Sequence, residues 1–264
     1  MIKDITLGQY LPGNSVVHRL DPRTKIILIF AYIVVLFTVK NVFGYAFSTL
    51  FLVFACALSK ISAKMLVKSL KPILFFVVFT AIINLFLTSG EVIFTFWIFK
   101  ITKEGVILTV KMALRLILLV TGTSLLTYTT SPIVLTDGIE KLLSPLSKIG
   151  VPSHEIAMMM TIALRFIPTI IDETDKIIKA QSARGSDFES GNLLRRAKAL
   201  VPILVPLFIS AFRRADDLAV AMECRCYHGG KNRTKLKSIK MTQLDLFSAL
   251  FCGIVFVAAI IWGR

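Results

Sequence analysis

Long apolar runs that contain few charges dominate this sequence. The run at residues 26–58 holds a single charged side chain, Lys40, among 33 positions. Further runs follow at residues 72–88, 105–130 and 244–262. Because a bilayer offers no water to backbone N–H and C=O groups, apolar runs of this length indicate membrane-spanning α-helices. The sequence therefore predicts an all-α fold, a polytopic membrane protein with about five transmembrane helices.

The run at residues 26–58 is too long for one span. As a single helix it would extend about 50 Å, whereas the hydrocarbon core of a bilayer is about 30 Å thick. Lys40, Asn41 and Gly44 lie near its middle and predict a turn between two short spans. A single tilted helix with an interfacial extension is the alternative.

The charge distribution predicts the orientation in the cell membrane. The chain carries 31 Lys and Arg against 16 Asp and Glu, yet 55% of its residues are hydrophobic. A nucleic-acid-binding domain would not need so apolar a composition, so we expect the lipid bilayer and no nucleic acid as a partner. Segment 60–71 holds four lysines and no acid, which places it in the cytoplasm by the positive-inside rule. Counting spans from there puts the N-terminus and residues 131–240 in the cytoplasm as well.

The chain divides into three predicted parts. Residues 1–130 form an N-terminal region of about four spans, and residues 241–264 form a C-terminal span. Residues 131–240 carry 17 basic and 11 acidic side chains. Helical periodicity persists through them, which indicates a folded cytoplasmic unit of long helices rather than a loop.

The cytoplasmic unit contains three predicted helices. Pro132 and Pro145 frame the first, which is amphipathic. Ser153 is the predicted N-cap of a second helix, about 30 residues long, and a third begins near Asn192. Prolines inside the two long helices predict kinks at Pro168, Pro202 and Pro206.

Both long helices end in an arginine between small residues. The two endings are Ala183-Arg184-Gly185 and Cys224-Arg225-Cys226. One interpretation is structural, since a cation in the last turn interacts favourably with the helix dipole. The repetition of the ending favours another, in which each guanidinium at a helix tip pairs with a carboxylate in a groove of a partner.

Other charged residues have open interpretations. Within the unit, or between it and another subunit, we predict ion pairs that involve Arg165, Asp172, Arg214, Asp217 and Glu223. Lys111 and Arg115 lie on one face of a predicted span, where a functional role, snorkelling to the interface and structural pairing are alternatives.

The segment before the first span has a local interpretation. Asp21 is a good N-cap and Pro22 is favoured at the first helical position. Arg19, Arg23 and Lys25 are predicted to lie among anionic headgroups at the cytoplasmic face.

Metal, cofactor and catalytic chemistry are not predicted. Cys224, Cys226 and His228 are spaced by two, a spacing at which helical side chains point apart, and no second ligand cluster accompanies them. There is no Walker A sequence, so we expect no ATP hydrolysis by this chain. The remaining alternatives are an intramembrane enzyme and a stand-alone permease that binds substrate through Asn84, Lys111 and Arg115.

The sequence resembles the transmembrane T-component family, EcfT, of energy-coupling factor transporters over almost its whole length. The motifs that carry the resemblance are residues 18–25, 144–152, 163–168, 180–185, 214–219 and 222–227. The resemblance implies a non-catalytic subunit that joins two ABC-type ATPases, EcfA and EcfA', to one S-component that captures a vitamin or micronutrient.

The resemblance also implies roles for the helix ends. Residues 183–185 and 224–226 correspond to X-Arg-X motifs, each of which docks in a groove of one ATPase. The family favours Ala-Arg-Gly at both positions, whereas cysteines flank Arg225 here. The apolar segments Met158–Met160 and Val201–Ile209 would offer a surface to the S-component, or else pack within the unit.

Overall fold

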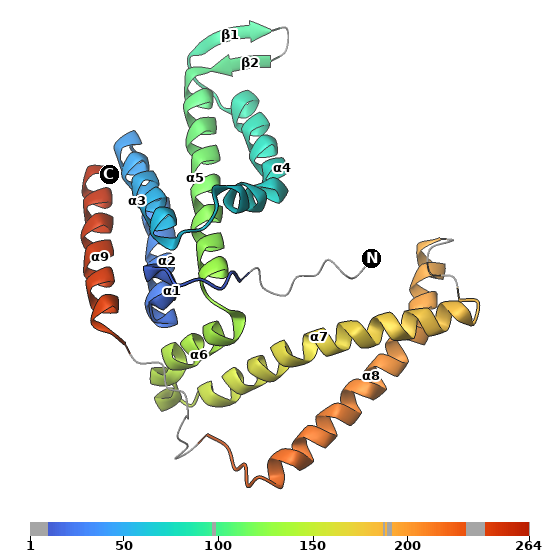
Figure 1. Ribbon diagram of the computed structural model, residues 1–264. Helices are drawn as coiled ribbons and strands as arrows, with labels where there is room; N and C mark the ends of the chain where they lie inside the picture. The colour runs from blue at the N-terminus through green and yellow to red at the C-terminus, as the bar shows by residue number, and fades with distance from the viewer. Residues whose placement is uncertain (1–9, 97–98, 187, 189–191, 231–240, 264) are drawn as a thin grey trace. The chain divides into compact units, whose positions relative to one another are not determined.

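The computed structural model describes residues 10–96, 99–186, 188, 192–230 and 241–263. These residues are almost entirely helical (Figure 1), which confirms the predicted all-α membrane fold. They fall into two units, which are described separately. The first unit comprises residues 10–138 and 241–263, and the second comprises the described residues from 139 to 230.

The elements of the two units follow in chain order. The first unit contains α1 (Val16–Arg19), α2 (Pro22–Thr38), α3 (Val42–Ser59), α4 (Ala63–Leu87), β1 (Val92–Phe96), β2 (Phe99–Thr102), α5 (Lys103–Thr129), the start of α6 (Pro132–Leu143) and α9 (Gln243–Gly263). The second contains the end of α6, the 3₁₀ helix η1 (Ser144–Ile149), α7 (Ser153–Ala183) and α8 (Leu193–Glu223). The division falls inside α6, between Gly138 and Ile139, so the predicted boundaries at 130 and 240 stay a prediction.

Within the described residues, five helices are long and apolar enough to cross a membrane. They are α3, α4, α5, α7 and α9. The number of candidate spans agrees with the prediction, but the helices that make up the set differ from the predicted ones. Helix α2 has only 17 residues, about 26 Å of helix, and α7, which the sequence assigns to the cytoplasmic unit, has the required length and apolar composition.

The break predicted in the first apolar run is confirmed. Helix α2 ends at Thr38 and α3 begins at Val42, so the single-helix alternative is wrong. Between α4 and α5 the structure departs from the all-helical expectation. Strands β1 and β2 pair antiparallel there, with Thr95 opposite Lys100 and Phe96 opposite Phe99.

Helix α4 begins nine residues before the predicted span. It includes the lysine-rich segment from Ala63 onwards, and Pro72 lies inside it. Figure 1 shows the helix bending between its lower and upper parts. A proline ring removes a backbone hydrogen bond and clashes with the preceding turn, which accounts for such a bend.

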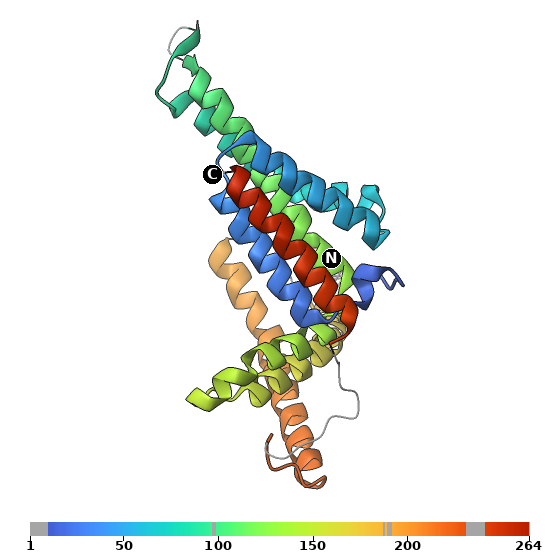
Figure 2. The ribbon, with the colours of Figure 1, turned by 90° about the vertical axis from the view of Figure 1, so that its left-hand side faces the viewer.

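The core of the first unit lies among α2, α3, α5 and α9, which contact one another (Figures 1 and 2). Its largest fully buried apolar side chains are those of Leu36 in α2 and of Val39, the C-cap residue that follows α2. Tyr32 packs between Phe51 of α3 and Phe256 of α9, with ring centroids 5.9 and 6.1 Å away. Helix α4 contacts α5 and contributes no buried residue to this core.

A buried polar cluster joins the N-terminal ends of α2 and α9. Asp21 is the N-cap of α2, as predicted, and accepts a hydrogen bond from the Arg23 N–H at 2.9 Å. The Asp21 N–H donates to Asp245 Oδ1 at 2.7 Å, while Asp245 Oδ2 accepts from the N–H and hydroxyl of Thr242. One carboxylate therefore caps α9 and binds the start of α2.

Lys25 corrects a prediction. Its side chain does not reach lipid headgroups, because the residue is only 6% exposed. The ammonium donates to the carbonyl oxygens of Thr129 at 3.1 Å and His18 at 3.3 Å, and to the Thr130 hydroxyl at 3.1 Å. Thr129 ends α5, where carbonyl groups lack intrahelical partners. Lys25 therefore caps the C-terminal end of α5.

Arg115 pairs structurally, one of the three alternatives that the sequence left open. Its Nε and Nη2 atoms donate to the Tyr45 hydroxyl at 3.0 and 2.6 Å, and Nη2 lies 3.5 Å from the Val39 carbonyl oxygen. The guanidinium also lies over the Phe37 ring, 5.4 Å from its centroid. Arg115 of α5 thus binds the turn between α2 and α3.

Helices α3 and α9 approach closely at two glycines. A Cβ on Gly44 would lie 2.5 Å from Val39 Cγ1 and 2.8 Å from the Gly263 Cα. We expect Gly44→Ala to lower the free energy of unfolding by about 1–3 kcal/mol through overpacking. Thermal unfolding in detergent, followed by size-exclusion chromatography, measures the change.

Gly253→Ala is the matched control for this prediction. Gly253 lies in the same helix pair, and nothing lies within 4 Å of its hypothetical Cβ. Since alanine favours a helix over glycine by up to about 1 kcal/mol, this variant should be as stable as the parent or more so. Equal unfolding midpoints for the two variants would contradict the close approach of α3 and α9.

Candidate functional site at the ends of α7 and α8

Helices α7 and α8 form the frame of the second unit. Each has 31 residues, which corresponds to about 46 Å of helix. In Figure 1 the two helices cross, and their C-terminal ends point in different directions. As predicted, α7 contains Pro168 and α8 contains Pro202 and Pro206. The predicted N-cap of α7 is wrong, because Ser153 is the first helical residue and Pro152 takes the cap position without a side-chain hydrogen bond.

A hydrogen bond ties the end of α7 to a kink in α8. Pro206 has no N–H, so it cannot satisfy the Pro202 carbonyl one turn before it. Gln181 Nε2 donates to that carbonyl oxygen at 3.3 Å. Gln181 lies three residues before Arg184, so the α7 tip is held against the proline turn of α8.

An ion pair forms a second tie between the two helices. Arg214 Nη2 lies 2.6 Å from Glu173 Oε2, so the partner of Arg214 is Glu173 and not the neighbouring Asp172. In the described part of the chain, the remaining candidates make no ion pair within 4.0 Å; they are Arg165, Asp172, Asp217 and Glu223. Their pairing with another subunit stays a prediction.

The C-terminal end of α7 is a Schellman motif. The Gly185 N–H donates to the Ser182 carbonyl oxygen at 3.0 Å, and the Ser186 N–H donates to that of Gln181 at 3.0 Å. Gly185 has φ +87°, in the left-handed region where glycine is favoured. Arg184 is therefore the last residue before the chain reverses.

Helix α8 ends in the same motif. The Cys226 N–H donates to the Glu223 carbonyl oxygen at 2.9 Å, and the Tyr227 N–H donates to that of Met222 at 3.0 Å. Cys226 has φ +55° and occupies the position that Gly185 occupies in α7. Arg225 and Arg184 are thus equivalent in backbone geometry, although the flanking residues differ.

All six motif residues are exposed. Among the described residues, neither Arg184 nor Arg225 has an ion-pair partner within 4.0 Å. The structure therefore assembles each triplet at its own helix end and does not bring the two triplets together (Figure 1). Each end presents a guanidinium with small residues on either side, which lets another backbone approach closely.

Cys226→Gly tests the shared geometry. A non-glycine residue in the left-handed region costs roughly 1–2 kcal/mol. We expect this variant to raise the free energy of unfolding by about 1 kcal/mol, while Cys224→Gly, at a helical φ of −60°, lowers it by a similar amount. Thermal unfolding of the two variants under the same conditions compares them, and the opposite order would contradict the left-handed cap.

Sequence reasoning missed several residues that hold the site together. Pro206 in the sequence indicates that the carbonyl oxygen of residue 202 lacks its helical donor, but that Gln181 supplies the donor depends on how α7 and α8 cross. The hydrogen bond between His154 Nδ1 and Glu140 Oε1, 3.0 Å apart, joins α6 to the start of α7 and carries no sequence signal. In the described ranges, no group of three His, Cys, Asp or Glu residues could hold a metal ion.

Comparisons with known proteins find relatives over almost the whole chain. A family model described as cobalt transport protein, CbiQ, matches residues 13–236. A protein of Thermosediminibacter oceani is 56% identical over 259 residues, which cover 98% of each chain. A protein of Clostridium kluyveri is 58% identical over 266 residues, covering 100% of this chain and 98% of its own. A protein of Bacillus subtilis is 46% identical over 263 residues, covering 99% and 98%. All three are named energy-coupling factor transporter transmembrane protein EcfT.

Proposed function

The chain belongs to the family of transmembrane T-components, EcfT, of energy-coupling factor transporters, and from this premise we propose that it couples two cytoplasmic ATPases to a substrate-binding S-component. ATP hydrolysis by the ATPases would then drive reorientation of the S-component in the membrane during uptake of a vitamin or micronutrient. The chain itself is a multi-pass membrane protein with a non-catalytic role.

One observation carries the proposal, namely that α7 and α8 end in the same exposed arginine cap. A guanidinium donates several hydrogen bonds in a fixed geometry that matches a carboxylate. Two equivalent tips on separate helix ends suit two related partners, and the two ATPases, EcfA and EcfA', are such partners. We assign Ala183, Arg184 and Gly185 to one docking site, and Cys224, Arg225 and Cys226 to the other.

Helices α7 and α8 supply the mechanical connection in this proposal. Gln181 and Arg214 fasten the two helices at separate points, so a movement of one tip is passed to both. Helix α8 also exposes apolar side chains over several turns: Val201, Leu204, Val205, Phe208, Ile209 and Phe212. We propose that this surface, together with the exposed Met159 of α7, faces the S-component.

The proposed orientation places the N-terminus and the second unit in the cytoplasm. It follows the lysines of segment 60–71, of which Lys60, Lys64, Lys68 and Lys71 are all exposed. A stand-alone permease is less well supported. Two of its three candidate substrate ligands bind within the chain, since Arg115 bonds Tyr45 and the Asn84 side chain donates to the Thr80 carbonyl oxygen at 2.9 Å.

Affinity purification tests the division of labour. A tag on this chain should recover two ATPases and an S-component from native membranes in mild detergent. The chain purified alone should neither hydrolyse ATP nor bind a vitamin with high affinity. Vitamin binding by the isolated chain, or its recovery without any ATPase, would refute the proposed coupling role.

A further inference from the structure

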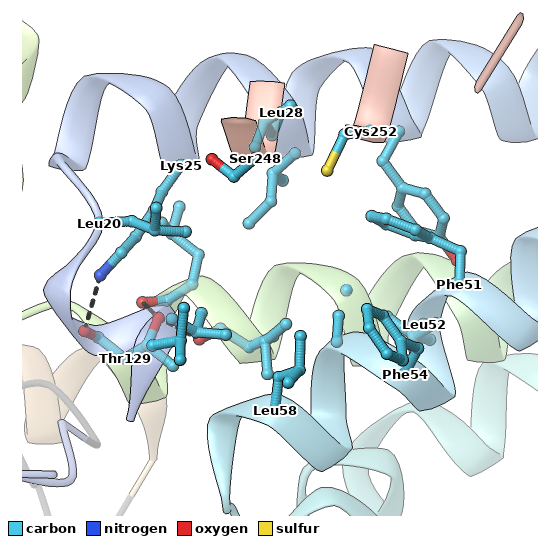
Figure 3. Close-up of a pocket in the computed structure, with 18 of the residues that line it drawn as sticks. Leu20, Lys25, Leu28, Phe51, Leu52, Phe54, Leu58, Thr129, Ser248 and Cys252 are labelled. Atoms are coloured by element: carbon cyan, nitrogen blue, oxygen red, sulfur yellow. Dashed lines mark hydrogen bonds between the residues drawn. The ribbon is translucent and has the colours of Figure 1, made fainter. Parts of the chain in front are cut away.

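The first unit encloses an apolar cavity of about 150 Å³ (Figure 3). It lies among α1, α2, α3, α5 and α9, so five segments of the chain contribute to its wall. In Figure 3, Lys25 and Leu20 lie at one end of the cavity and Phe51 and Phe54 at the other, with Leu28, Ser248 and Leu58 along its sides. The cavity adjoins the core but is not filled by it.

The chemistry of the wall suits an apolar occupant. The Lys25 ammonium is already bound by three oxygens, the Thr129 hydroxyl donates to the Leu125 carbonyl oxygen, and the Ser248 hydroxyl donates to that of Asp245. Among the described lining residues, the Tyr32 hydroxyl is the buried oxygen without a hydrogen-bond partner. An internal water needs two to four partners, and apolar cavities of about this size stay dry and bind molecules such as benzene.

The wall is continuous with the surface that a bilayer covers. Phe54 of α3 and Phe251 of α9 line the cavity, yet they are 47% and 49% exposed. Leu58 and Val16, which also line it, are exposed as well. Since α3 and α9 are membrane spans, the molecules next to these side chains are lipid chains.

We propose that the cavity binds the terminal segment of an acyl chain of a membrane phospholipid, since about 150 Å³ is the size of a benzene-binding cavity. The rings of Phe54 and Phe251 pack against each other, with centroids 5.8 Å apart, so the acyl chain enters where this ring pair separates and occupies the space bounded by α2 and α5. One adjoining cation, Arg19, favours an anionic headgroup, because it is exposed and lies next to the lining residue Leu20. This site belongs to the first unit and does not depend on the proposed docking of ATPases.

Photocrosslinking of the full chain in lipid nanodiscs tests the site. The discs contain phosphatidylethanolamine with increasing fractions of a phosphatidylglycerol that bears a diazirine in its acyl chain. We expect crosslinks at Leu58, Leu125 and Phe251 that saturate as the probe fraction rises, because one site is filled. Crosslinks that rise linearly and spread evenly over exposed span residues would overturn the proposal.

Two substitutions on α3 provide a matched pair. Ala55 lines the cavity, whereas Ala57 is exposed and does not. Ala55→Trp should lower crosslinking inside the cavity about tenfold. The indole would exclude a few methylene groups of the lipid from the cavity, and the free energy of burying them corresponds to about that change in affinity. Ala57→Trp should leave crosslinking unchanged. An equal effect of the two substitutions would also overturn the proposal, and the saturation measurement on the parent chain decides the question if Ala55→Trp does not fold.

Discussion

The double variant Arg184→Glu, Arg225→Glu, extracted in mild detergent and purified through a tag on this chain, is expected to be recovered without its ATPases. Each charge reversal would replace the proposed charge-assisted hydrogen bond to an ATPase carboxylate with repulsion between like charges. Loss of such an interface anchor costs about 2 kcal/mol or more, which is about 30-fold in affinity. In the proposed complex the two tips bind as a linked pair, so the double variant should lose far more affinity than either single variant. Substrate uptake by whole cells should fall to the background of a strain that lacks the chain.

Two further variants separate docking from general charge effects. Arg213→Glu makes the same charge change on α8, at an exposed residue without an ion-pair partner within 4.0 Å in the described part of the chain. It should co-purify ATPases at the parental yield. Arg184→Lys keeps the charge but loses the forked geometry, so its yield should be intermediate. Recovery of ATPases at normal yield with the double reversal would remove the helix ends from the coupling mechanism.

Asp245→Ala is expected to be the most destabilising single substitution in the first unit. It leaves the N–H groups of Asp21 and Thr242 without acceptors. It also removes a carboxylate that interacts with the charge of the buried Lys25. Removing one partner of a buried pair of opposite charges leaves the other charge uncompensated, which lowers the free energy of unfolding by about 3–5 kcal/mol. In a chain of this size the midpoint of thermal unfolding should fall on the order of 10 °C.

Asp245→Asn is the graded control. Its amide oxygen can accept one of the two backbone hydrogen bonds, while the negative charge is lost. The midpoint should therefore lie between those of Asp245→Ala and the parent chain. Heating in detergent followed by size-exclusion chromatography gives all three midpoints. A parental midpoint for Asp245→Ala would show that the cluster does not hold α2 and α9 together.

Local sequence signals predicted the parts of the fold that depend on neighbouring residues. Asp21 followed by Pro22 marked a helix start, and Lys40-Asn41 marked the break between α2 and α3, both as the structure has them. Lys25 was misjudged because its partners, Thr129 and Thr130, lie more than 100 residues away in sequence. The hydrophobic periodicity of a sequence carries no information about a contact between residues so far apart in the chain.

The candidate site divides in the same way. The arginine endings were visible in the sequence, since an arginine next to small residues at the end of a long helical pattern is a local feature. Their shared backbone geometry was not predicted, because Cys226 adopts the conformation that glycine normally supplies. The pairing of Arg214 with Glu173 instead of Asp172 depends on how α7 and α8 cross, and a crossing is decided by packing.

The bond between Gln181 and Pro202 places the α7 tip at a turn of α8 that lacks its own backbone hydrogen bond. A helix bends most easily where such a bond is missing. A displacement of Arg184 would therefore be transmitted to α8 at the turn where α8 bends most easily, and would change the curvature of α8. A displacement of Arg225 would be transmitted along α8 to the same turn. In the proposed complex, α7 and α8 would bend at this one position, so neither ATPase could displace its helix end without a response in the other helix.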